Sequence, residues 1–143
     1  MLKLLERTFQ VDSSKADAWA HLADVESWPT WARHIRKLEI TPPGELSDHS
    51  AGALVLTNGI RSTFRMTELN PGRNWKWTGP FLWITVDYDH QFCELGPRQC
   101  EILFVLEGSG FGVGIFGRLF AAIYARNLDR AIPRLIAELN GEK

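Results

Sequence analysis

Polar side chains in apolar surroundings are the residues of this sequence best placed to do chemistry. His90 lies between Tyr88 and Phe92 in an alternating segment, and Asn127 interrupts an apolar helical stripe. An unpartnered buried polar group costs about 1–3 kcal/mol, so such groups find protein partners or serve a ligand. His90 is therefore the candidate general acid or base, and Tyr88, Tyr124 and Asn127 could orient a bound polar group. The alternative is that His90 and Asn127 satisfy each other or nearby backbone groups.

Familiar catalytic motifs do not extend this set. The segment Gly112-Val-Gly114-Ile-Phe-Gly117 matches Gly-x-Gly-x-x-Gly, but only 26 residues follow it, too few for the further parallel strand of a dinucleotide fold. His90 and Cys93 are three residues apart, so on a strand they point to opposite faces and form no metal site. The sequence has no Gly-x-Ser-x-Gly elbow for a nucleophilic serine. We expect no metal and no cofactor.

Composition excludes several classes of partner. The chain has 143 residues, with 16 Lys and Arg against 17 Asp and Glu, a formal net charge of -1. No global positive field is present to attract nucleic acid. The length suits one domain, over residues 1–143, and an apolar content of 45% with six Trp suits a large core or a lined cavity.

Location follows from the termini, the apolar runs and the cysteines. Residues 1–10 contain Lys3, Glu6 and Arg7 and lack the apolar run of a signal peptide, so we expect a cytoplasmic protein. The longest apolar stretch, residues 111–125, is interrupted by Arg118 and is shorter than the roughly 20 residues of a membrane span. No stable membrane insertion is expected. In the cytoplasm the two cysteines, Cys93 and Cys100, should be free thiols.

The elements that must position these residues follow from periodicity and turn signals. Residues 2–11 read as a strand, and Ser14 with Asp17 forms a capping box before a short helix. A second short helix is expected around Pro29. Residues 35–110 then alternate between extended segments and turns, which predicts about six antiparallel strands. The strongest turn signal is Asn58-Gly59, which should supply the positive φ values of a tight hairpin.

The last segment, residues 113–139, predicts one long helix. Its apolar stripe is expected to contain Phe116, Leu119, Phe120, Ile123, Asn127, Ala131, Leu135 and Leu139. Pro133 removes one backbone donor, so a kink or break is expected near residues 129–133. The order of elements predicts an α+β, helix-grip fold: a curved antiparallel sheet of about seven strands around the long C-terminal helix, with two short helices after the first strand.

Strand parity predicts which side chains face the helix. The even residues of 84–92 are apolar or aromatic while the odd ones are polar, and the even residues of 100–106 are assigned to the same face. A sheet bent around a helix should leave a cleft of roughly 300–1,000 Å³. The side chains expected to contact a ligand there are Trp31, Phe64, Met66, Trp77, Tyr88, His90, Phe92, Phe104, Phe116, Phe120, Ile123, Tyr124 and Asn127.

Residues 11–31, with Trp19, Leu22, Asp24, Trp28 and Trp31 in a recurring pattern, resemble the opening of a known family. The family is the polyketide cyclase/dehydrase and lipid-transport group of the START-like, birch-pollen-allergen-like helix-grip superfamily (SRPBCC). The resemblance also covers Asn70-Pro-Gly, the Trp77 strand and the Gly-rich entry to the last helix. It implies the helix-grip fold and an internal pocket for a small hydrophobic molecule.

Three functions are compatible with this sequence. The first is a non-catalytic carrier or sensor of a lipid, a quinone or a polyketide-like aromatic. The second is a cyclase or dehydratase in which His90 moves a proton while Tyr88 or Asn127 holds a carbonyl group. The third is a module that docks apolar surface on a partner or membrane, with Phe81-Leu82-Trp83 as the contact. The first is preferred, because parity points Asp87 and Asp89 away from His90.

Overall fold

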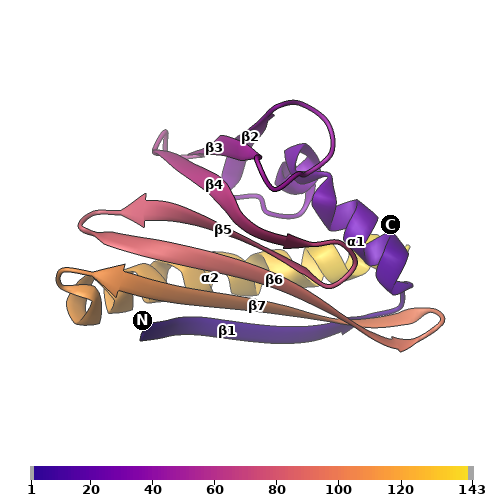
Figure 1. Ribbon diagram of the computed structural model, residues 1–143. Helices are drawn as coiled ribbons and strands as arrows, with labels where there is room; N and C mark the ends of the chain where they lie inside the picture. The colour runs from indigo at the N-terminus through magenta and orange to yellow at the C-terminus, as the bar shows by residue number, and fades with distance from the viewer. Residues whose placement is uncertain (1, 142–143) are drawn as a thin grey trace.

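A seven-stranded antiparallel sheet curls around one long helix in the computed structural model, which describes residues 2–141 (Figure 1). The elements are β1 (Leu2–Val11), α1 (Lys15–Ala23), the 3₁₀ helix η1 (Val25–Thr30), β2 (Ile35–Thr41), β3 (Ala51–Leu56), β4 (Arg61–Asn70), β5 (Asn74–Phe81), β6 (Ile84–Gly96), β7 (Gln99–Gly110) and α2 (Val113–Leu139). The strand order is β1-β7-β6-β5-β4-β3-β2. The predicted helix-grip architecture is confirmed.

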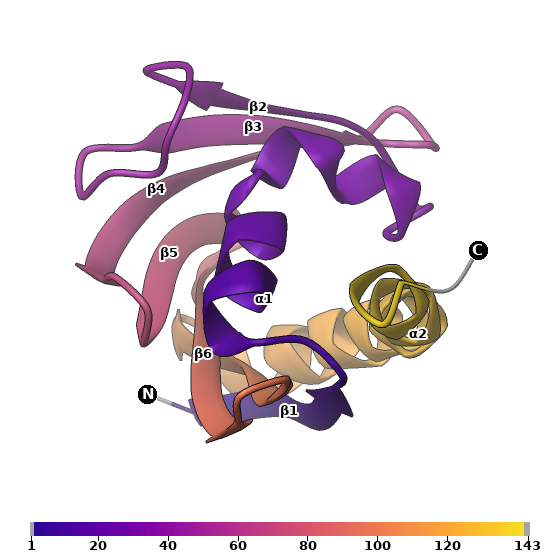
Figure 2. The ribbon, with the colours of Figure 1, turned by 90° about the vertical axis from the view of Figure 1, so that its right-hand side faces the viewer.

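The two edge strands are β1 and β2, and the two short helices connect them. Strands β2 to β7 follow one another through hairpins, whereas β1 pairs with β7 at the opposite edge. Figure 2 shows α1 and η1 crossing one end of the curled sheet between these edges, with α2 lying inside the curl beside β1. As predicted, Ser14 caps α1, and its side chain accepts a hydrogen bond from the Asp17 amide at 3.1 Å.

The hairpin at Asn58-Gly59 forms, but its geometry differs from the expectation. Gly59 has a φ of 91°, in the left-handed region that glycine tolerates. Asn58 does not have positive φ, and its side-chain oxygen instead accepts from the Ile60 amide at 3.0 Å. Gly59 therefore supplies the required positive φ alone, and Asn58 acts through its side chain, as Asn often does in turns.

Strand parity predicts the buried face of the sheet correctly. Phe92 pairs with Ile102, and the register then shifts between Glu94 and Gly96. This irregularity leaves the Cys100 side chain buried inside and the Cys93 side chain exposed outside, as expected.

The helix α2 has the predicted bounds, and Phe120, Ala131 and Leu135 of the predicted stripe are buried. Leu119 and Ile123 are 50% and 52% exposed, so the predicted stripe is wrong there. The residues of α2 that are buried are Gly117, Phe120, Leu128, Ala131 and Leu135. The helix also continues through Pro133, whose side chain is exposed, so the expected break does not occur.

Most of the core lies between the sheet, α1, η1 and the C-terminal half of α2. A smaller cluster around Ile84, Val86, Leu106 and Phe120 fills the end where α2 begins. Polar contacts attach α2 to other elements: Arg7 Nε donates to Asp129 Oδ1 at 2.7 Å, and His21 Nε2 lies 2.8 Å from Glu138 Oε1. Among residues 2–141, no helix is both long and apolar enough to cross a membrane.

Candidate functional site

His90 lies at the centre of the concave face, on the middle strand β6. Its backbone pairs with Trp75 on β5 and Phe104 on β7. Rings surround the imidazole: Trp75 stacks on it at a centroid distance of 4.8 Å, and Trp77 meets it edge-on at 4.8 Å. Trp28, from η1, approaches to 5.7 Å. The alternation of β6 thus places one polar ring inside an aromatic cage.

One hydrogen bond sets the tautomer of His90. Its Nδ1 lies 3.2 Å from the backbone oxygen of Trp75. A carbonyl oxygen only accepts, so Nδ1 carries the proton and, in the neutral ring, Nε2 is a bare acceptor. Among residues 2–141, Nε2 has no hydrogen-bond partner. Of the two kinds of partner left open for His90, the backbone group is the one present, at Nδ1, and Asn127 is not bonded to the ring.

Burial keeps the His90 ring neutral. The side chain is 4% exposed, and desolvation lowers its pKa to about 4, against smaller opposing effects from the Trp75 carbonyl and Asp89. Asp89 is not a partner inside the cavity, because its carboxylate accepts from the side-chain amides of Asn74 and Gln91 at 2.9 and 2.8 Å. At neutral pH His90 is thus a hydrogen-bond acceptor in an apolar site.

A cavity adjoins the His90 ring between the sheet, η1 and α2. It is lined by Trp28, Trp31, Ala32, His34, Ile35, Tyr88, Asp89, His90, Phe104, Leu106, Tyr124, Leu128 and Ala131. Its volume is about 20 Å³, which is room for about one water molecule. The expected cleft of several hundred Å³ is therefore wrong for this conformation, because side chains from three elements fill the space under the sheet.

Besides His90 and Asp89, whose carboxylate is bonded to side-chain amides, the polar groups of the cavity wall are two tyrosines and a histidine. Tyr88 and Tyr124 lie with ring centroids 5.8 Å apart, and neither hydroxyl has a hydrogen-bond partner among the described residues. Burial raises the pKa of Tyr124 to about 12 and also raises the pKa of Tyr88, so both hydroxyls stay protonated. Burial likewise lowers the pKa of His34. The wall therefore offers neutral donors and acceptors.

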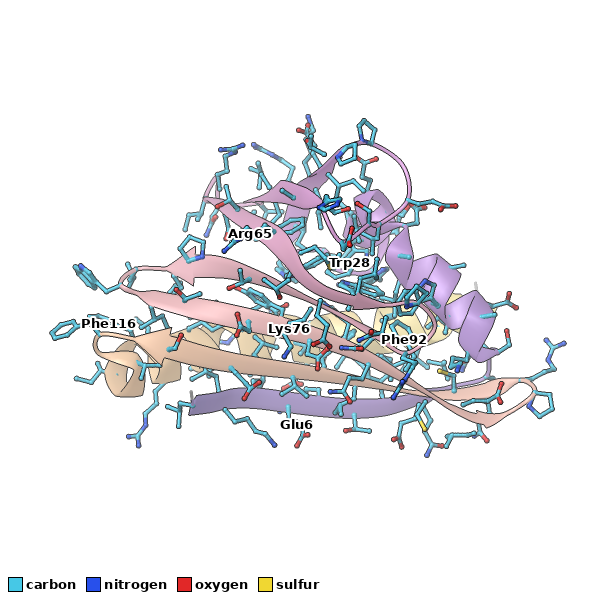
Figure 3. The ribbon with its side chains drawn as sticks, in the orientation of Figure 1. Glu6, Trp28, Arg65, Lys76, Phe92 and Phe116 are labelled. Atoms are coloured by element: carbon cyan, nitrogen blue, oxygen red, sulfur yellow. The ribbon has the colours of Figure 1, made fainter. Side chains whose placement is uncertain are left out.

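The structure brings together only part of the predicted ligand-contact set. The predicted residues that line the cavity are Trp31, Tyr88, His90, Phe104 and Tyr124. Those that are buried but lie outside its wall are Phe64, Met66, Trp77, Phe92 and Phe120. Figure 3 shows Phe92 near the α1 end of the sheet and Phe116 at the opposite end of the molecule. Phe116, Ile123 and Asn127 do not reach the cavity, and Ile123 faces outward.

Several lining residues escaped the sequence argument. Leu128 lies four residues after Tyr124 and is absent from the predicted stripe, whereas Ala131 is in the stripe but not among the predicted ligand contacts; a helix face in phase with Tyr124 contains both. Trp28 was noted only in a family pattern; its Nε1 donates to the Leu22 carbonyl at 2.8 Å, which holds the ring over the cavity. His34 follows η1 in a loop, where no periodicity marks its direction.

This geometry places neutral polar groups in an aromatic enclosure, and comparisons with known proteins identify the family to which the chain belongs. The sequence profile of the family described as polyketide cyclase / dehydrase and lipid transport matches residues 4–139. The chain belongs to this family. The resemblance noted in residues 11–31 is confirmed, and membership in the polyketide cyclase/dehydrase and lipid-transport family indicates a ligand-binding or cyclase-type role.

Solved structures share this fold at low sequence identity. Protein XoxI from Bacillus cereus has a TM-score of 0.77 at 14% identity, covering 97% of this chain and 96% of its own. The Zhui aromatase/cyclase from a Streptomyces species has a TM-score of 0.72 at 17% identity, covering 94% and 92%. A START superfamily protein from Mycobacterium smegmatis has a TM-score of 0.68 at 17% identity, covering 94% and 97%. No curated protein matches the chain.

Proposed function

We propose that residues 1–143 act as one unit that binds a small hydrophobic molecule, as a carrier or sensor. A lipid, a quinone and a polyketide-like aromatic all fit this class. The observation that carries the proposal is the polar set of the cavity wall: His90 Nε2 and the hydroxyls of Tyr88 and Tyr124 lack protein partners in an aromatic enclosure. These atoms border the cavity and are not fully enclosed by protein, so a ligand with polar atoms on an apolar body could pair with them.

Binding must enlarge the cavity, because its present volume of about 20 Å³ holds no organic molecule. The wall that can move is α2 together with the loop after η1. Helix α2 packs beside β1 at one edge of the curl, while η1 covers the other side of the opening (Figure 2). The ion pair of Arg7 with Asp129 is exposed and contributes little to stability, so it is a weak restraint on α2.

The charge state of His90 favours binding over acid–base catalysis. A general acid or base works best when its pKa lies near the working pH, and the pKa of His90 is lowered to about 4. No carboxylate lies beside His90 in the cavity. The Asp89 carboxylate is bonded to side-chain amides on the outer face of the sheet, and Asp87, two residues earlier on the same strand, points to that face as well. A neutral acceptor without an acidic partner suits recognition.

A cyclase or dehydratase is the second candidate. It is favoured by the similarity in fold to the Zhui aromatase/cyclase and by the exposed lone pair on His90 Nε2. In this function the Nε2 atom would accept a proton from an oriented substrate, and a tyrosine hydroxyl would donate to a carbonyl oxygen. A substrate that binds His90 directly would have to raise its pKa toward neutrality.

Native mass spectrometry after gentle purification tests the binding function, with the apolar dye Nile red as an added probe. Ala131→Leu should fill the cavity and abolish dye binding, while Ala122→Leu, on the exposed side of the same helix, should leave it unchanged. Circular dichroism of both variants checks that α2 still folds. Equal dye binding by the two variants would place the dye outside the cavity and remove the support for this function.

His90→Phe separates the two candidates, because it keeps an aromatic ring and removes the acceptor. For a carrier, affinity should change by about one hydrogen bond, roughly 0.5–1.5 kcal/mol. For an enzyme, turnover should fall about 10²–10⁴-fold while binding persists. We expect the carrier result. Turnover of a polyketide-like substrate that is abolished in His90→Phe would establish the enzyme instead.

A further inference from the structure

Large apolar side chains are exposed together at the end of the molecule where β5 turns into β6 and β7 turns into α2. Phe111 is 82% exposed, Ile115 77% and Trp83 67%. The Trp83 ring lies 4.9 Å from that of Phe116, which joins the two turns. Figure 3 shows Phe116 at this end of the molecule. We call this surface the apolar tip; its residues are Leu82, Trp83, Phe111, Ile115, Phe116 and Leu119. Single exposed apolar residues are ordinary, but a contiguous group of this kind marks an interaction surface.

The backbone at Leu82 adds an independent indication. Phe81 pairs with Ile84, so the turn between them has two residues, and Leu82 occupies its first position with a φ of 54°. Glycine is the residue favoured at such a position, and a bulky side chain there is strained by roughly 1–2 kcal/mol. Leu82 is nevertheless 58% exposed and gains little from the core. Because burial within the chain does not offset this backbone strain, the exposed Leu82 side chain points to a contact with another molecule.

The charges around the tip have one sign. Arg118 is an exposed cation within the tip segment, and Arg126 is another, about two helical turns further along α2; residues 108–128 contain no Asp or Glu, and the next carboxylate, that of Asp129, is bonded to Arg7. The first turn of α2 has no acidic residue and no side-chain cap, so the positive end of the helix dipole adds to this charge. The nearest carboxylates along the strands, Asp87 and Glu107, are cross-strand neighbours on the outer face of the sheet, away from α2.

We propose that the apolar tip docks on the surface of an anionic lipid bilayer. Trp and Phe side chains favour the boundary between headgroups and acyl chains, and flanking Arg side chains favour anionic lipids. Self-association through the tip is disfavoured, because it would bring the Arg118 side chains of two copies together without a carboxylate. The interaction is peripheral, since none of the helices described over residues 2–141 can cross a membrane.

Vesicle co-sedimentation of the whole chain tests the proposal. Vesicles of phosphatidylcholine alone are compared with mixtures of phosphatidylcholine and phosphatidylglycerol, at low and high salt. Two double variants remove the contributions separately: Phe111→Ser with Ile115→Ser, and Arg118→Gln with Arg126→Gln. The matched control carries Leu95→Ser with Arg98→Gln, an exposed apolar residue at the end of β6 and an exposed cation in the β6–β7 turn, at the other end of the molecule (Figure 1).

The wild type and the control should bind the anionic vesicles and lose binding at high salt. The apolar variant should bind about tenfold more weakly or worse, because it removes two apolar side chains from the contact. The arginine variant should lose roughly 25-fold, at about a factor of five for each cation near an anionic surface. All these residues are exposed, so thermal midpoints should stay within a few degrees of wild type.

Three results would overturn the proposal. The first is no binding to either vesicle, and the second is equal binding to neutral and anionic vesicles. The third is concentration-dependent dimerisation in light scattering that the Phe111→Ser, Ile115→Ser variant abolishes, which would make the tip an interface between copies. Because the tip variants leave the cavity wall intact, Nile red binding should be unchanged in them, so this test and that of the ligand-binding function can fail separately.

Discussion

Lowering the pH should destabilise this protein through His90, in a way that a non-titrating variant lacks. The pKa of the buried ring is about 4, against an ordinary value of 6.5. Between these values the unfolded chain binds a proton that the folded chain does not, so the free energy of unfolding falls as the pH falls. The contribution is fully present above the unfolded pKa and is lost progressively toward pH 4.

The magnitude follows from the two pKa values. When the pKa of a group differs by one between the folded and the unfolded chain, the free energy of unfolding changes by about 1.4 kcal/mol, so the complete loss below both values is about 3.4 kcal/mol. Between pH 7 and pH 4.5 the free energy of unfolding should already lose about 2.5 kcal/mol of this contribution. A domain with an unfolding free energy of roughly 5–15 kcal/mol would register this clearly.

Urea denaturation followed by tryptophan fluorescence, in steps from pH 7.5 to pH 4.5, measures this effect. Other titrating groups, such as the second buried ring, His34, whose pKa is lowered by burial, also respond to pH in this range. They remain in His90→Gln and His90→Phe, so subtracting the variant curves from the wild-type curve isolates His90. The glutamine variant also retains a donor for the Trp75 carbonyl.

The free energy of unfolding of wild type, measured relative to that of His90→Gln, should fall by about 2.5 kcal/mol as the pH falls from 7 to 4.5. This change does not depend on the difference between the two proteins at pH 7. Parallel curves for wild type and both variants would refute the reasoning. They would mean that His90 keeps an ordinary pKa, and therefore that the ring reaches water and is not enclosed by the aromatic cage.

Other consequences of the structure can be checked by mutation and chemistry. Leu128→Ala should lower the unfolding free energy by about 2–4 kcal/mol, because its side chain is buried, whereas Leu119→Ala should change it by less than about 0.5 kcal/mol; equal effects in urea denaturation would contradict the observed face of α2. In the folded protein a thiol reagent should modify Cys93 quickly and Cys100 only on unfolding, with two free groups in the unfolded, non-reduced chain; fewer than two would mean a disulfide. Leu82→Gly should raise the thermal midpoint slightly, since relief of a φ of 54° exceeds the added flexibility of glycine; a clear fall would show that Leu82 contributes to the core.

The strands could be predicted from the sequence because they depend on local geometry. Side chains on a strand alternate between two faces, so polar and apolar residues in β6 identified the inward position of His90 without any knowledge of its neighbours. The same alternation placed Cys93 and Cys100 on opposite faces and required the irregular register beside Gly96. The Ser14 cap and the bounds of α2 likewise depend on a few adjacent residues.

The candidate site needed information that no local pattern contains. Near its start α2 has two apolar faces, one packed on the sheet through Phe120 and one exposed through Leu119 and Ile123, so periodicity alone placed residues of both faces in one stripe. The cavity volume depends on how rings from η1, the sheet and α2 interlock, and the partner of His90 is a carbonyl on the neighbouring strand. The sequence therefore determined which residues face inward on each strand. Only tertiary packing decided which of them meet, because helix phase, cavity volume and hydrogen-bond partners depend on side chains far apart in the chain.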